Sequence, residues 1–146
     1  MVPSAGDEAA RILALSKDDP LTAFQIVERQ LGVLVLRTQV LLSLCGIVIT
    51  VTGFSGRAIA QTSLFARASI SVGICVVLLA AAVAIWGVLR LQWLTQVATG
   101  AVMETLVRAI EIRNRKSRFL GAALVLFVLG FSLYCAAIAQ LLMAQG

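Results

Sequence analysis

Histidine is absent from the 146 residues of this chain. Without it the chain has no Ser–His or Cys–His nucleophile pair, no histidine-bearing zinc or copper site and no axial histidine for haem. The sequence also contains no GxGxxG loop and no P-loop, so nothing indicates a nucleotide site. We therefore expect no enzymatic activity, no catalytic residue, no cofactor and no metal, and no small-molecule substrate is evident.

Charged residues are scarce as well, at 13% of the chain against about 25% in soluble domains. The seven carboxylates all lie outside three uncharged stretches, residues 38–56, 68–89 and 119–146. No acidic side chain is therefore available within those stretches to carry protons across a membrane. The net charge of +5 comes from basic residues that flank the apolar stretches. This placement favours anionic lipid headgroups over nucleic acid as the partner.

Apolar residues make up 60% of the chain, and the mean hydropathy is +1.00. Each uncharged stretch approaches or exceeds the roughly 20 residues that a helix needs to cross a ~30 Å hydrocarbon layer. A soluble globule of this size cannot bury three such helices on all their faces. We therefore predict an all-α integral membrane protein with three transmembrane helices, near residues 34–54, 68–91 and 119–143, and with cytoplasmic helical extensions.

Asp19 and Pro20 mark the start of the first long helix, since aspartate caps free N–H groups and proline fits the first helical position. We predict one helix from Leu21 to about Thr52, whose first part, residues 21–34, is an amphipathic extension outside the membrane. Residues 1–19 are expected to be a flexible cytoplasmic tail, in which residues 9–15 could form a surface turn of helix. Residues 20–146 are then a single three-helix membrane domain.

The other two spans have distinct borders. Trp86, Arg90 and Trp93 close the second span, because indole rings and a snorkelling arginine prefer the headgroup layer. No proline or glycine separates Ala101 from Leu120. A polar extension over residues 101–118 should therefore continue directly into the third span, and the two are expected to form one helix of about 40 residues.

The basic residues predict the orientation, since cytoplasmic loops carry an excess of lysine and arginine. In a three-span protein ten of the twelve fall on one side, and only Arg57 and Arg67 fall on the other. This asymmetry places the N-terminus and the 90–118 connection in the cytoplasm and the C-terminus outside a cytoplasmic (inner) membrane. The residues expected to set topology or meet lipid headgroups are Arg37, Arg90, Arg113, Arg115, Lys116 and Arg118. The preferred interpretation of Arg37 is an anchor at the membrane boundary, and the alternative is a gate or an anion contact.

Small and polar residues form a stripe on the first span at spacings of 4, 3, 4 and 3: Gln39, Ser43, Gly46, Thr50 and Gly53. The stripe could be a helix-packing face, because small residues let backbones approach, or it could line a pore. The second span has a matching strip of Gly73, Ala80, Ala84 and Gly87. The third span has one of Gly121, Ser132, Cys135 and Ala139. We also expect a small interhelical hydrogen-bond network among Thr50, Ser71, Tyr134 and Gln140. Cys45, Cys75 and Cys135 are read as small apolar fillers.

Two segments carry a family resemblance: residues 37–50 (RTQVLLSLCGIVIT) and 115–130 (RKSRFLGAALVLFVLG). They resemble the small helical membrane modules of bacterial anti-phage effectors, of the Pycsar-effector and SLATT types. In that comparison Arg37 takes the place of a lysine and Lys116 that of a later basic residue. Val35 stands where the family has an acid, and Thr38–Gln39 replace Ala–Ser. The resemblance implies a membrane-disrupting effector that is held inactive until a cytoplasmic sensor signals.

The residues by themselves favour a different role. They predict a small, non-enzymatic membrane protein that acts as a structural or interaction subunit through helix–helix packing. Such a protein is expected to form a homo-oligomer or to join a larger membrane complex. The alternative is a membrane-perturbing or pore-forming effector of a bacterial defence system.

Overall fold

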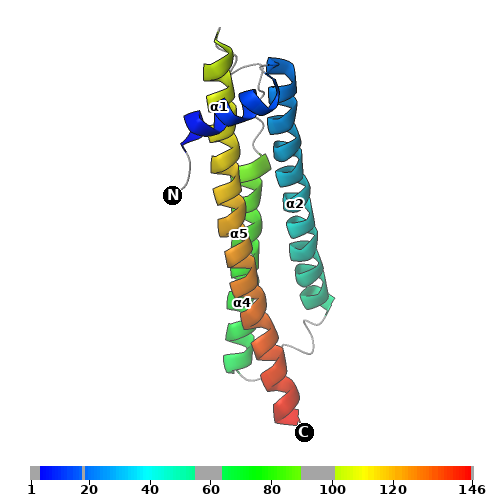
Figure 1. Ribbon diagram of the computed structural model, residues 1–146. Coiled ribbons are helices and arrows are strands. Elements are labelled where there is room, and N and C mark those ends of the chain that lie inside the picture. The colour runs from blue at the N-terminus through cyan, green and yellow to red at the C-terminus, as the bar shows by residue number, and fades with distance from the viewer. Residues whose placement is uncertain (1–3, 18, 55–63, 90–100, 146) are drawn as a thin grey trace.

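The computed structural model describes residues 4–17, 19–54, 64–89 and 101–145. The described residues form helix α1 (Ala5–Leu15), α2 (Pro20–Phe54), α4 (Leu64–Ala84) with the π-helical turn η1 (Ile85–Leu89), and α5 (Val102–Gln145). Helices α2, α4 and α5 run as three long rods, and α1 lies across one end of the bundle (Figure 1). This is the predicted all-α membrane architecture.

Helix α2 begins where the sequence predicted. The backbone N–H groups of Leu21 and Thr22 donate to the carboxylate of Asp19 at 3.1 and 3.3 Å. The Thr22 hydroxyl also donates to this carboxylate, and this bond, with the two from the backbone, holds the pKa of Asp19 below its ordinary value. The helix then continues without interruption for 35 residues to Phe54, as expected from the absence of proline after Pro20.

Helix α5 confirms that the polar extension and the third span are one continuous element. It has 44 residues, which correspond to about 66 Å at 1.5 Å per residue. The hydrocarbon layer is only ~30 Å thick. A large part of α5 therefore has to extend beyond the hydrocarbon.

Part of the N-terminal segment, which was expected to be a flexible tail with a turn of helix over residues 9–15, forms the longer helix α1 (Ala5–Leu15). Ser4 and Asp7 form a capping box, in which the Asp7 N–H donates to Ser4 Oγ at 3.2 Å and the Ser4 N–H donates to Asp7 Oδ2 at 3.3 Å. The helix that follows has 11 residues and buries Ala9 and Ile12. Two buried side chains and a satisfied cap therefore contribute to the stability of a helix in a segment that is polar on average.

Among the described residues, buried apolar side chains form three clusters along the bundle. The first joins α1, α2 and α5 at the polar end, through Ala9, Ile12, Ala23, Val27, Leu106, Ala109 and Ile110. The second joins α2, α4, η1 and α5 in the middle of the bundle, around Leu41, Val77 and Leu120. The third joins α4 and α5 through Ile70, Tyr134 and Ala137. We call α1, residues 20–33 of α2 and residues 102–117 of α5 the head.

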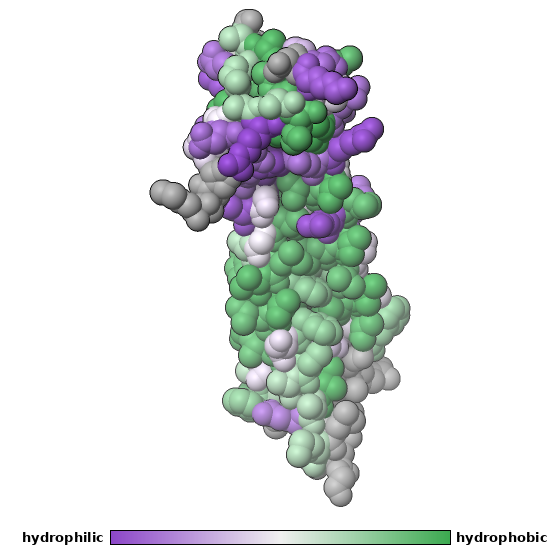
Figure 2. All heavy atoms as spheres, viewed as in Figure 1, coloured by the Kyte–Doolittle hydropathy of each residue, from purple (hydrophilic) through white to green (hydrophobic). Residues whose placement is uncertain are grey.

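The outer surface of the bundle below the head is apolar. In the most hydrophobic window of each long helix only 22–28% of the residues are buried within the chain. Large side chains such as Val40 and Val125 are 55% and 59% exposed. Figure 2 shows hydrophilic residues gathered at the end where α1 lies and a hydrophobic surface below them. Such a surface is stable in lipid and not in water.

Helices α4 and α5 approach each other closely, backbone to backbone, at two glycines. A Cβ atom added to Gly73 would lie 3.0 Å from the carbonyl oxygen of Gly130, and one added to Gly130 would lie 2.9 Å from that of Gly73. Both neighbours are backbone atoms, which cannot rotate away. Gly73, Ala80 and Ala84 of the small-residue strip predicted on the second span are buried on α4, and its fourth member, Gly87, is half-buried on η1 against Phe119. The strip predicted on the third span does not pack within the chain: Gly121, Ser132, Cys135 and Ala139 are exposed, and Ala123, Gly130 and Ala137 face α4 or the core instead.

Replacement of Gly130 by alanine is expected to destabilise the bundle by about 1–3 kcal/mol, the usual cost of overpacking. The reason is that the new methyl group meets the α4 backbone and forces the two helices apart. The matched control is Gly121→Ala on the same helix, where the added Cβ has nothing within 4 Å. Thermal unfolding in detergent measures both variants, and equal midpoints would contradict the close contact.

Candidate functional site

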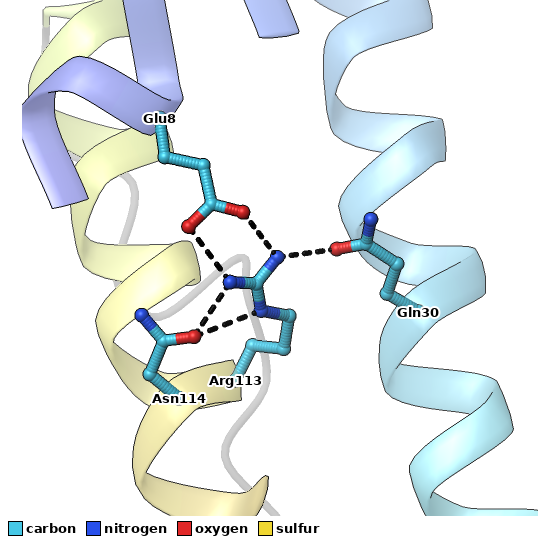
Figure 3. Close-up of polar contacts among 4 residues, drawn as sticks. All are labelled: Glu8, Gln30, Arg113 and Asn114. Atoms are coloured by element: carbon cyan, nitrogen blue, oxygen red, sulfur yellow. Dashed lines mark hydrogen bonds and ion pairs between the residues drawn. The ribbon is translucent and has the colours of Figure 1, made fainter. Parts of the chain in front are cut away.

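Arg113 of α5 is the centre of a polar network that ties the head together. Its Nη1 and Nη2 donate to the two carboxylate oxygens of Glu8 on α1 at 2.7 and 2.8 Å (Figure 3). A two-pronged bond of this kind fixes the direction of the guanidinium as well as its distance. Glu8 and Arg113 are 105 positions apart in the chain, and their pairing fastens α1 to α5.

Two side-chain amides are the other hydrogen-bond acceptors of Arg113. Arg113 Nη1 also donates to Gln30 Oε1 at 2.6 Å, and Nη2 and Nε donate to Asn114 Oδ1 at 2.5 and 3.1 Å. A guanidinium has five N–H donors and no acceptor. All five are therefore engaged, and α1, α2 and α5 meet at one side chain.

A pocket of about 330 Å³ opens beside this network, between α2 and α5. It is lined by Gln30, Val33, Leu34, Arg37, Arg113, Asn114 and Ser117. Arg37 is exposed, and its guanidinium has no hydrogen bond or ion pair within the described part of the chain. The lining therefore holds one compensated arginine, Arg113, and one without a counter-charge, Arg37.

The pocket lies at the border between the charged and the uncharged parts of the sequence. Arg37 directly precedes the uncharged stretch that begins at Thr38, and Arg118, next to Ser117, directly precedes the one that begins at Phe119. In Figure 2 the hydrophilic end of the molecule gives way to the hydrophobic surface just below the head. The pocket is thus placed where a membrane surface would meet the protein.

The remaining basic and aromatic residues that the sequence singled out are dispersed. Arg115 and Arg118 are exposed, and Lys116 is half-buried. Trp86 is 74% exposed on η1. Arg90 and Trp93 lie outside the described residues.

The stripe Gln39, Ser43, Gly46, Thr50 and Gly53 lies on the outer side of α2, where all five residues are exposed. At 100° per residue it sits about 140° around the helix from the buried face. That buried face carries mainly larger residues: Leu34, Thr38, Leu41, Cys45, Val48 and Thr52. The stripe therefore does not pack against the other helices of its own chain.

Hydroxyl groups on α2 bond to their own helix and not to other helices. Ser43 Oγ donates to the Gln39 carbonyl at 3.0 Å, and Thr50 Oγ1 donates to the Gly46 carbonyl at 2.8 Å. This i−4 bonding satisfies a hydroxyl without any partner helix. The interhelical network that the sequence predicted is not formed at Thr50, and Ser71 and Gln140 are exposed, while Tyr134 is buried with Ile70 and Ala137.

The three cysteines are free thiols in separate places, with Cys45 buried and Cys75 and Cys135 exposed. Among the residues that the structure describes, no group of three or more His, Cys, Asp or Glu side chains could hold a metal ion. The polar groups that come together in the head and the adjoining pocket are two amides, a hydroxyl, a carboxylate and two arginines. The carboxylate is paired with Arg113, and the arginines, amides and hydroxyl carry donor groups of the kind that bind anions.

Sequence reasoning found both arginines of the pocket but missed their neighbours. It identified Arg37 and Arg113 as basic residues at a membrane boundary. It gave no role to Glu8, Gln30, Asn114 or Ser117. The capping signal at Ser4 and Asp7, with apolar Ala9 and Ile12 on one side of the following turn, could have indicated an ordered helix that carries Glu8.

Glu8→Gln is expected to loosen α1, because it removes the counter-charge of Arg113. Hydrogen exchange of the amides in residues 5–15 should accelerate by about five-fold, which corresponds to ~1 kcal/mol for a partly exposed ion pair. Glu28→Gln is the control, since it makes the same change of charge at an exposed position of the head. Equal exchange in the two variants would show that the ion pair does not hold α1 in place.

No protein-family model matches this chain, and no curated protein or solved structure is significantly similar to it. Any function assigned to it therefore rests on its own residues and geometry.

Proposed function

We propose that this chain is a small, non-enzymatic subunit of the cytoplasmic membrane that acts structurally or by interaction, through packing of helices. The observation that carries the proposal is the outward position of the stripe on α2. Gly46 and Gly53 have no atom within 4 Å of an added Cβ. A second helix could therefore approach the α2 backbone closely along this face.

The spacing of the stripe fits a seam between two helices. Gln39, Gly46 and Gly53 recur every seven residues, and Ser43 and Thr50 lie between them. A 3.5-residue period keeps one face of a helix against a partner as the two wind around each other. Gln39 has no hydrogen-bond partner for its side chain within the described part of the chain, and an amide carries both donors and an acceptor. Two copies of Gln39 could therefore bond to each other, which supports a homo-oligomer.

A second function uses the same observation. If several copies turned their stripes toward a common axis, Gln39, Ser43 and Thr50 would line a path for water. The protein would then be a membrane-perturbing or pore-forming effector, as the family resemblance implies. The outward position of the stripe supports this alternative as well, so the two functions differ in what the assembled stripe faces.

Gly46→Leu is expected to weaken self-association by about ten-fold, because the larger side chain holds the second helix away. Gly121→Leu is the matched control, since Gly121 is also exposed and also has open space around it. Light scattering coupled to size-exclusion chromatography in detergent measures the mass of the complex. An oligomer that survives Gly46→Leu unchanged would overturn the role of the stripe.

Reconstitution into dye-loaded vesicles separates the two functions. A structural or interaction subunit should leave the dye inside. Release by the wild type that is abolished by Gln39→Leu and Ser43→Leu would instead establish the effector, because both changes remove polar groups from the stripe.

We also propose that the head lies in the cytoplasm and that the C-terminus lies outside. Ten of the twelve basic residues support this orientation by the positive-inside rule. A reporter enzyme fused after Gly146 is expected to be active only if it works in the exported compartment. Activity of a reporter that works only in the cytoplasm would reverse the orientation.

A further inference from the structure

We infer that the pocket between α2 and α5 binds the phosphate headgroup of an anionic membrane lipid. The pocket volume of about 330 Å³ falls within the roughly 300–1,000 Å³ that small-molecule sites occupy. The inference does not depend on the proposed function, because the pocket and the stripe use different residues.

The charge of the pocket comes from Arg37. The guanidinium of Arg113 is compensated by Glu8, and its five N–H groups are engaged. Arg37 lines the same pocket and has no counter-charge within the described part of the chain. The seven lining residues include no carboxylate. An anion is therefore the ligand that this electrostatic environment selects.

Arg113 also determines the orientation of the neighbouring side-chain amides. Because a guanidinium only donates, Gln30 and Asn114 must turn their oxygens toward it, as Figure 3 shows. Each amide then keeps its NH₂ group, which can only donate. Together with the Ser117 hydroxyl and the Arg37 guanidinium, four side chains of the lining carry N–H or O–H groups of the kind that bind phosphate oxygens.

The surface below the pocket favours a lipid over a free phosphate. Val33, which lines the pocket, is 48% exposed, and Val40, Leu44 and Val51 continue below Arg37 on the same side of α2 with 44–55% exposure. Acyl chains can lie along these side chains while the headgroup remains at the level of Arg37. Basic pockets between helices at a membrane surface bind phospholipid headgroups in this manner.

The test uses the full-length protein in a neutral detergent, titrated with short-chain phosphatidylglycerol or with phosphatidylcholine while its thermal unfolding is followed. Phosphatidylglycerol is expected to raise the midpoint more than phosphatidylcholine does. Arg37→Gln should reduce the apparent affinity for phosphatidylglycerol about five-fold, the effect of one basic residue near an anionic surface. Arg29→Gln makes the same change of charge at an exposed position of α2 outside the pocket, and it should bind as the wild type does.

Three outcomes would overturn the inference. Equal losses in Arg37→Gln and Arg29→Gln would mean that lipid is attracted by the overall charge and not by the pocket. Protection by inorganic phosphate equal to that by phosphatidylglycerol would identify a site for the free anion. Should Arg37→Gln fail to fold, Ser117→Ala gives the same readout, and wild-type affinity for phosphatidylglycerol in that variant would contradict the site.

Discussion

A peptide group inside a bilayer has no water with which to form hydrogen bonds, so each span has to satisfy its backbone within one helix. In this chain α2 and α5 extend that solution far beyond the hydrocarbon, because their 35 and 44 residues exceed the roughly 20 that a crossing requires. The excess emerges at the same end of the bundle, where α1 covers it (Figure 1). The head is thus built largely from the ends of the same helices that form the spans. A change in how the spans pack would therefore shift the helix ends that form the head.

Within the bilayer, association depends on close approach, because lipid is as apolar as the helices themselves. Gly73 and Gly130 permit a close approach and bring the backbones of α4 and α5 together. Helix α2 joins the other helices through larger side chains such as Leu41 and Val48. Its small residues are left on the opposite side. A face that permits close approach but has no partner in its own chain is the basis for the proposed association between copies.

The two arginines near the head, Arg113 and Arg37, differ in whether their charge is compensated. A carboxylate and two amides surround Arg113 and use every donor that it has. Arg37 lies on the facing helix and receives no such partner within the described residues. The difference between these two arginines separates a structural ion pair from a group that is available to a ligand. In this arrangement Glu8 neutralises Arg113, and Arg37 supplies the charge of the pocket.

The sequence alone determined how many helices are long and apolar enough to span a membrane, where α2 begins, and that the third span continues from a polar extension without a break. These features depend on local chemistry: the cap at Asp19, the absence of proline, and the length of the uncharged stretches. The tertiary structure decided which side of each helix meets a neighbour. In the structure the stripe of α2 faces outward, and the contact on α5 is at Gly130 and not at Gly121. Glu8 and Gln30 lie against Arg113. Hydropathy does not predict these features, because a span is apolar on every side and only the fit between surfaces distinguishes one side from another.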